Sequence, residues 1–156
     1  ISSDIQYFSF LRSINELQIA RLFAKNKDYY KVFKSCNVGS KTDSWCGKCP
    51  KCLFTYIIMS PFISEEELKD IFGKNLLNDN DLLPILKQLK GEAEVKPFEC
   101  VGTIEEVNAC IEFSQKAKDE RQKSFLVENL LNQYDENNNL PKYFEAILKD
   151  NLFKNN

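Results

Sequence analysis

Three cysteines spaced three residues apart constrain this chain more than any other feature. They lie in the segment SWCGKCPKC at residues 44–52, and a fourth cysteine lies ten positions upstream of the first. Two thiolates separated by two residues can bind one metal ion, because the intervening turn directs both sulfurs to the same point. A glycine and a proline within the segment suit such tight turns. The spacing predicts a four-thiolate site formed by Cys36, Cys46, Cys49 and Cys52.

Zinc is the occupant that this ligand set favours, since Zn²⁺ accepts four thiolates in a closed tetrahedral site with a structural role. An iron–sulfur cluster is one alternative. The ferredoxin run, however, places its fourth cysteine and a proline just after the third, where this chain has LFTY at 53–56. Disulfides are the other alternative, because six cysteines can pair in many ways. Disulfides within such short loops would be strained, and nothing else indicates a secreted chain.

The composition narrows the classes of function. A chain of 156 residues can build one sizeable core. Its net charge of -2 argues against a nucleic-acid partner, which would select a basic surface. No apolar run reaches the roughly 20 residues that span a bilayer, and no signal peptide is visible, so we expect a cytoplasmic protein without a membrane partner. The chain has no histidine, so any acid–base chemistry must use other side chains.

Helical patterns dominate the rest of the chain. Capping-box spacings occur at Ser13/Glu16, Ser64/Glu67 and Thr103/Glu106, each directly before an apolar-periodic stretch. The aromatic stretch at 6–11 is a candidate strand, 92–102 is a loop, and the tail from 151 is expected to fray. Helices are expected at 14–25, 53–60, 65–72, 80–90, 104–118, 120–133 and 141–150. The predicted fold is mainly α, with a four-cysteine zinc knuckle and at most one or two short strands.

Four segments resemble known proteins. FKSCNVGSKTDSWCGKCPKCLFTY resembles the four-cysteine element of the PP-loop ATP pyrophosphatase superfamily. Together, FSFLRSINELQIARLFA, IFGKNLL and KPFECVGTIEEV resemble the C-terminal part of the ATP-dependent UDP-N-acetylmuramoyl-L-alanyl-L-glutamate epimerase family. The resemblance covers about residues 6–110. It implies an enzyme that uses ATP and Mg²⁺ to adenylate the terminal L-glutamate of a UDP-activated muramoyl dipeptide and inverts it for peptidoglycan synthesis.

The same resemblance implies that this chain is a fragment of a larger α/β enzyme. The superfamily binds ATP phosphates on an S-G-G-x-D-S-like loop, and no such stretch occurs here. We therefore expect residues 1–35 to lead in from a missing N-terminal nucleotide-binding domain, 36–60 to form the zinc knuckle and following helix, and 61–156 to form a helical region. Such a fragment should not catalyse alone. The absence of an initiating methionine agrees with this, although a trimmed start is an alternative.

The stretch KPFECVGT at 96–103 concentrates candidate chemistry. Lys96 can contact a carboxylate or phosphate, Glu99 can carry a proton, and Cys100 can act as a thiol acid or base. The helix opening at Thr103 offers backbone N–H groups to an anionic substrate. Arg12 follows the candidate strand, at a place where α/β enzymes often bind ligands. The plainer interpretation is that Cys100 and Phe98 are buried packing and that Lys96 and Glu99 are solvated. Cys110 is expected in the core.

Two other functions stay open at this point. A related PP-loop ligase or amidating enzyme would share the architecture but not the reaction. A non-catalytic, zinc-stabilised helical module that binds a protein partner would share only the knuckle.

Overall fold

The computed structural model describes residues 4–115 and 125–154, and all regular secondary structure within these residues is helical. Short 3₁₀ turns lie before and within the four-cysteine segment 36–52 and before α4, at Lys27–Tyr29 (η1), Gly39–Thr42 (η2), Leu76–Asn78 (η3) and Asn80–Leu82 (η4). The α-helices are α1 (Glu16–Ala24), α2 (Pro50–Met59), α3 (Glu65–Phe72), α4 (Leu83–Leu89), α5 (Ile104–Gln115), α6 (Phe125–Leu131) and α7 (Lys142–Lys149), the last continuing into a π-helical turn, η6 (Asp150–Lys154). The predicted mainly α fold is confirmed. None of the helices in the described residues combines the length and apolarity that crossing a membrane requires.

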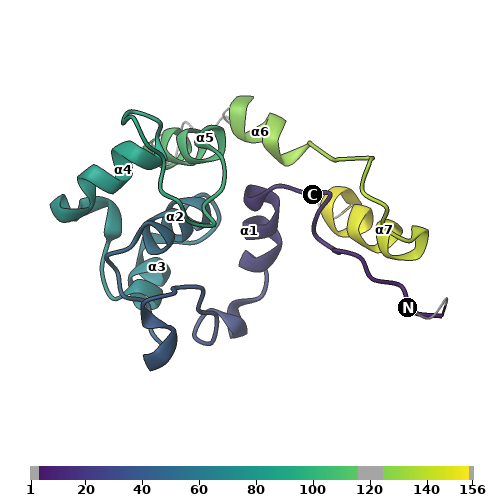
Figure 1. Cartoon of the computed structure of the whole chain (residues 1–156), viewed down its shortest axis with the longest axis horizontal. Helices are drawn as coiled ribbons and strands as arrows, with labels where there is room; N and C mark the ends of the chain where they lie inside the picture. Colours follow the sequence, from purple (N-terminus) through teal and green to yellow (C-terminus); the bar gives the residue numbers. More distant parts are fainter. Residues whose placement is uncertain (1–3, 116–124, 155–156) are drawn as a thin grey trace.

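Helix α2 is the centre of the main core. Every residue from Cys52 to Met59 is buried, and α2 packs against α1, α3, α4 and α5. Figure 1 shows these helices gathered around α2. A helix surrounded in this way needs apolar side chains on all faces, which explains why LFTYIIM has no amphipathic pattern. The helical interpretation of 53–60 is confirmed, and Cys52 lies on the first turn of α2.

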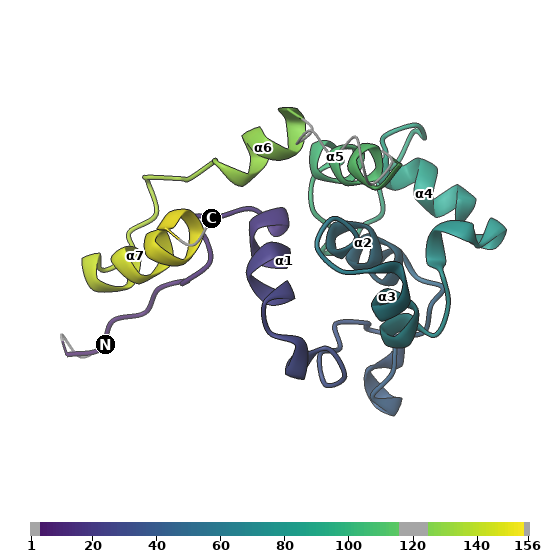
Figure 2. The same ribbon diagram turned by 180° about the vertical axis from the view of Figure 1, so that it is seen from behind.

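A second, smaller apolar cluster surrounds α7. Leu140, Leu148 and Leu152 are buried there, and Phe8 and Ile14 pack against them. Figures 1 and 2 show α7 and the N-terminal segment lying together on the side of α1 opposite to α3 and α4. Helix α1 joins the two clusters, since it contacts both α2 and η6.

Local capping signals placed several helix ends correctly. Ser64 and Glu67 form the expected capping box, and Gly73 ends α3 in the left-handed conformation with φ 79°. Pro84 lies in the first turn of α4, and Gly91 follows its end with φ 76°. Thr103 accepts a hydrogen bond from the backbone of Glu106 at the start of α5. Residues 116–118 and 120–124, also expected to be helical, lie outside the described residues.

The start of the first helix was predicted wrongly. Helix α1 is capped by Asn15 and Gln18, which form a reciprocal capping box, whereas Ser13 is buried and does not cap it. Asn15 is held in place by tertiary contacts, because its side-chain amide donates to the carbonyl of Leu130 at 2.7 Å. Two capping-box spacings therefore overlapped in the sequence, and a distant contact selected the second.

Two other expectations need correction. The stretch 6–11 forms no strand; it is extended up to residue 9 and then turns. The tail does not fray where it is described, since η6 continues α7 to residue 154 and Leu152 is fully buried. The guanidinium of Arg21 donates to the carbonyl of Leu152 at 2.8 Å, which anchors this turn against α1.

Candidate metal centre and the neighbouring loop

The four predicted cysteines meet at one point. Their sulfur atoms all lie within 4.8 Å of one another. The separations are 3.8 Å for Cys36–Cys49, 3.7 Å for Cys46–Cys52 and 3.5 Å for Cys49–Cys52. The sequence prediction of a four-sulfur cluster is therefore matched by the tertiary structure.

These distances fit a metal ion better than a disulfide. Sulfur atoms bonded to one tetrahedral Zn²⁺ at about 2.3 Å lie about 3.8 Å apart, whereas a disulfide needs about 2.05 Å. All six cysteines are free thiols in the structure. Four soft sulfur donors around one point form a set that could hold a metal ion.

Local backbone features bring the sulfurs together. Cys49 is both a cluster member and the N-cap of α2, because its sulfur accepts from the backbone N–H of Cys52 at 3.5 Å. Pro50 occupies the first turn, where a missing N–H costs nothing. Gly39 lies against the backbone of Ser44, and a Cβ there would lie 1.8 Å from the Ser44 carbonyl oxygen. The loop that carries Cys36 can therefore close only with glycine at 39.

The thiols differ in their protonation. Burial alone would raise the pKa of Cys36, but backbone N–H donors of Cys46 and Gly39 lower this pKa to about 6. Burial raises the pKa of Cys49 to about 11 and also raises the pKa of Cys52. Without a cation, Cys49 and Cys52 therefore keep their protons at neutral pH. A divalent cation would displace these protons, so metal affinity should increase with pH.

Aromatic rings pack around Trp45, the residue before Cys46. The ring centroid of Trp45 lies 4.7 Å from that of Phe72 and 5.5 Å from that of Phe33, in tilted and edge-on arrangements. Its indole Nε1 is buried and has no hydrogen-bond partner among the described residues. Trp45 thus ties the four-cysteine segment to α3.

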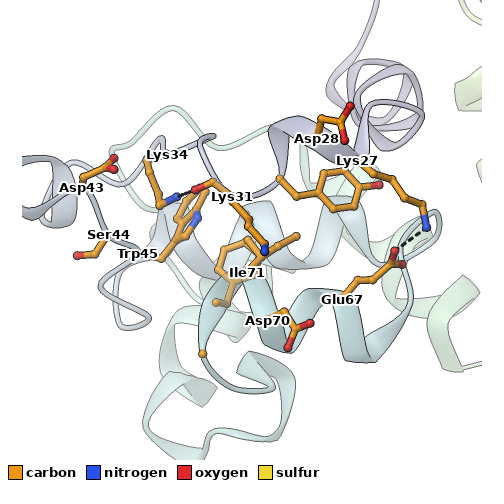
Figure 3. Close-up of a pocket in the computed structure, with 13 residues that line it drawn as sticks. Lys27, Asp28, Lys31, Lys34, Asp43, Ser44, Trp45, Glu67, Asp70 and Ile71 are labelled. Atoms are coloured by element: carbon orange, nitrogen blue, oxygen red, sulfur yellow. Dashed lines mark hydrogen bonds and ion pairs between the residues drawn. The ribbon is translucent and has the colours of Figure 1, made fainter.

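A pocket of about 800 Å³ lies beside this tryptophan. It is lined by η1 and the following residues, by 43–45, and by α3. Figure 3 shows Lys27 and Glu67 paired at one side, with their charged atoms 2.6 Å apart. Both signs of charge line it: Lys27, Lys31 and Lys34, with Asp28, Asp43, Glu67 and Asp70. The sequence did not indicate this pocket, because its three segments are distant in the chain and carry no shared motif.

Loop 96–103 is stabilised by hydrogen bonds between its own residues. The ammonium of Lys96 donates to the carbonyl oxygens of Val101, at 3.1 Å, and of Gly102. Glu99 and Cys100 are exposed, and Phe98 is fully exposed. The packing interpretation of Cys100 and Phe98 is therefore wrong, whereas Cys110 is fully buried in the core as expected.

Glu106 joins this loop to α1. Its carboxylate accepts from the backbone N–H and the hydroxyl of Thr103 at 2.6 and 2.9 Å. The other oxygen accepts from the backbone N–H groups of Glu16 and Leu17 at 2.8 and 3.3 Å. Glu106 is only 2% exposed. The N–H of Thr103, proposed as an anion donor, is thus already occupied by a carboxylate of the same chain.

The side chain of Arg12 is exposed and makes no hydrogen bond or ion pair with loop 96–103 within the described residues. Helix α1 begins at Glu16, four residues after Arg12. Glu106 joins this helix start to the start of α5. The capping-box spacing predicts the role of Glu106 at the start of α5, whereas its contact with the start of α1 has no local signal in the sequence.

Comparison with known proteins gives the family. The sequence model of the MurL C-terminal domain matches residues 32–143, which include all four clustered cysteines and loop 96–103. The chain belongs to the MurL C-terminal domain family. No solved structure matches it significantly.

Curated relatives of this MurL domain carry one name. A UDP-N-acetyl-alpha-D-muramoyl-L-alanyl-L-glutamate epimerase of a Micromonospora species is 47% identical over 104 residues, and that of Salinispora tropica is 45% identical over 104 residues. The protein of the same name from Xanthomonas oryzae pv. oryzae is 41% identical over 108 residues. These alignments cover 64–65% of this chain but 23–24% of each relative. The chain thus spans about a quarter of the length of the relatives it matches.

Proposed function

We propose that this chain is the C-terminal part of an epimerase that inverts the terminal L-glutamate of UDP-MurNAc-L-Ala-L-Glu, in an ATP-dependent step of peptidoglycan precursor synthesis. The observation that carries the proposal is the match to the MurL C-terminal domain over residues 32–143, together with relatives of 41–47% identity that share the epimerase name. The helical fold and the four-sulfur cluster within the matched region are consistent with it.

The chemistry explains why ATP is needed. The α-proton of a carboxylate is very hard to remove, because a second negative charge develops next to the first. Attack of the carboxylate oxygen on the α-phosphorus of ATP breaks the α–β phosphoanhydride bond, releases pyrophosphate and forms an acyl-adenylate, which neutralises the carboxylate and acidifies the α-carbon. A base on one face of that carbon and an acid on the other can then invert it. AMP is released when the activated carboxyl group is hydrolysed.

Within this proposal, the domain acts with a nucleotide-binding part that the matched region lacks. Residues 1–35 would lead in from that part, 36–60 would form the metal knuckle and α2, and 61–156 would complete the helical region. ATP and Mg²⁺ would bind to the other part, so the 156-residue chain should not catalyse alone. We place the reaction in the cytoplasm, where ATP is available.

The cysteine cluster would hold a structural Zn²⁺. Cys36, Cys46, Cys49 and Cys52 would fill all four positions, which leaves no site for a reactive water. Zn²⁺ would supply the cross-link, and the chain's own hydrogen bonds from Gly39 and Cys52 to sulfur would orient the ligands. The loop at 36–49 would then be fixed to the first turn of α2.

Loop 96–103 stays the candidate for the chemical step. Cys100 and Glu99 are exposed and free to approach a substrate held by the other part of the enzyme. Lys96 would have to exchange its bonds to the carbonyls of Val101 and Gly102 for contact with a substrate. Arg12 and Thr103 are proposed to contact the anionic substrate.

The test is an assay of the longer protein that contains this chain, with ATP, Mg²⁺ and UDP-MurNAc-L-Ala-L-Glu. We expect AMP release coupled to the appearance of D-glutamate at the dipeptide terminus, and loss of turnover in Cys100→Ser. ATP consumption with a new amide bond and no inversion would favour a PP-loop ligase or amidating enzyme. No ATP consumption at all would favour a non-catalytic module.

A further inference from the structure

Loop 96–103 is closed by contacts between its two ends. The half-buried side chain of Lys96 donates hydrogen bonds from its ammonium to the carbonyl oxygens of Val101 and Gly102. Pro97 follows Lys96, and its ring restricts the backbone of both residues. Because one ammonium binds two consecutive carbonyls, the residues between them have few conformations left. The lysine thus acts as a clamp across the loop.

The second end of the loop is fixed to the core. Val101 is only 7% exposed. A Cβ on Gly102 would lie 2.6 Å from Oε2 of Glu106 and 2.8 Å from Cζ of Phe54 on α2, so the backbone approaches both side chains as closely as only glycine allows. Figure 1 shows the loop passing beside α2 on its way from α4 to α5. The carbonyls that Lys96 binds therefore belong to backbone that is held in place by the core.

The tip of the loop carries the two candidate acid–base groups. The backbone N–H of Val101 donates to the carbonyl of Glu99 at 2.8 Å, which closes a three-residue γ-turn with Cys100 at its centre. Glu99 and Cys100 are exposed, and the neighbouring Phe98 is fully exposed. The place of these groups therefore depends on the turn and on the clamp, because little packs around the side chains themselves.

The bonds of Lys96 are hard to combine with a direct contact to a substrate. The carbonyl of a buried residue such as Val101 needs a donor. If Lys96 turned toward a carboxylate or phosphate, two carbonyls would lose their donor and the loop would open as the substrate binds. A group that moves a proton must stay within hydrogen-bond reach of the reacting atom, so an open loop does not suit the chemical step.

We propose that Lys96 and Gly102 are positioning residues, which hold the turn with Glu99 and Cys100 at a fixed place beside the start of α5. Lys96 acts through the loop and touches no substrate atom. The inference rests on the proposed function where that function assigns the chemical step to this loop. The clamp itself can be measured without any reaction.

Amide exchange, followed by NMR in the 156-residue chain, measures the clamp. Lys96→Met removes the N–H donors, and the amide of Val101 should then exchange at least about 10-fold faster. Lys96→Arg retains N–H donors and should keep the exchange slow. Lys87→Met, at an exposed position on α4, is the matched control and should leave this amide unchanged. Unchanged exchange in Lys96→Met would overturn the clamp.

Kinetics of the longer protein that contains this chain separate positioning from substrate contact. Lys96→Met and Gly102→Ala should each lower kcat by about 10- to 100-fold, since a displacement of roughly 1 Å can cost about 100-fold. KM for the UDP-muramoyl dipeptide should change by less than about twofold, and Lys96→Arg should restore most of kcat. A higher KM with unchanged kcat in Lys96→Met would overturn the proposal, because the lysine would then bind the substrate.

The two measurements keep the proposals apart. If the longer protein does not epimerise, the proposed function fails, whereas faster exchange of the Val101 amide in Lys96→Met still supports the clamp. If it epimerises and Lys96→Met loosens the loop without lowering kcat, the function stands and the positioning role is refuted. Melting temperatures show whether each variant folds, and Lys96→Met with its arginine counterpart decides if Gly102→Ala does not.

Discussion

The carboxylate of Glu106 accepts a hydrogen bond from the backbone N–H of Glu16 across 90 residues of sequence, at 2.8 Å. With its bonds to Thr103, this one buried side chain caps the start of both α1 and α5. An anion suits both positions, since helix N-termini carry partial positive charge.

Glu106→Ala should therefore destabilise the chain strongly. It removes an acceptor from buried N–H donors at two helix ends, and we expect the free energy of unfolding to decrease by about 2–4 kcal/mol. Urea denaturation measures this. Glu105→Ala, one residue earlier and exposed, is the matched control and should change stability by less than about 0.5 kcal/mol. Similar effects of both variants would show that the capping hydrogen bonds of Glu106 add no measurable stability.

Metal content should depend on the clustered cysteines alone. We expect one zinc per chain by elemental analysis of protein purified without chelators, and a large loss in Cys52→Ser. Structural zinc sites contribute on the order of 10–16 kcal/mol to local folding, so chelation should lower the melting temperature. Cys100→Ser is the control, because that thiol is exposed and lies outside the cluster. Undiminished zinc in Cys52→Ser would exclude the proposed ligand set.

Gly39→Ala should disrupt the loop that carries Cys36. The added Cβ would lie 1.8 Å from a backbone oxygen, which cannot move aside as a side chain would. We expect a loss of about 1–3 kcal/mol and weaker zinc retention during dialysis against a chelator. Gly73→Ala provides the comparison: its Cβ meets nothing within 4 Å, so the cost is the left-handed conformation alone, about 1–2 kcal/mol, with zinc retained. Equal zinc loss in both would contradict the steric explanation.

Glu16 should make stability depend on pH. Partial burial of its carboxyl group, and then the charge of Glu106, raise the pKa of Glu16 above its ordinary value of 4.5. A carboxyl whose pKa is raised by folding binds protons more tightly in the native state, so its charge destabilises the fold above that pKa. Glu16→Gln should thus stabilise the chain at pH 7. Because the carboxyl group is partly exposed and solvent screens its charge, we expect a gain of only about a few tenths of a kcal/mol, as for an exposed ion pair. The gain should vanish as the pH falls below 4.5.

Denaturation of both proteins at pH 7 and at pH 4 measures this difference. Glu16 also lies in the first turn of α1, where a negative charge is favourable. A lower stability of Glu16→Gln at pH 7 would mean that the helix dipole outweighs the repulsion from Glu106.

The C-terminal turn should contribute to stability. Leu152 is fully buried, and its carbonyl accepts from Arg21. Leu152→Ala should cost about 2–5 kcal/mol, as a buried leucine does elsewhere. The adjacent Phe153 is 38% exposed, so Phe153→Ala should cost clearly less. Thermal unfolding of the two variants measures this difference. Equal melting temperatures would show that η6 does not pack against α1 in solution.

The sequence by itself determined the features whose cause is local. The ends of α3, the place of Pro84 in α4 and the start of α5 depend on residues a few positions apart, and the four cysteines lie within one stretch from Cys36 to Cys52. Short loops can bring such residues together in few ways, so their spacing is informative.

The tertiary structure decided the features that depend on distant partners. Asn15 caps α1 in preference to Ser13, with its side chain bonded to the Leu130 carbonyl, and the tail is helical with Leu152 buried against α1. Glu106 acquired its second role in the same way. Hydrogen bonds and burial across 90 or more residues outweigh the small differences in local propensity, and no sequence window contains both partners.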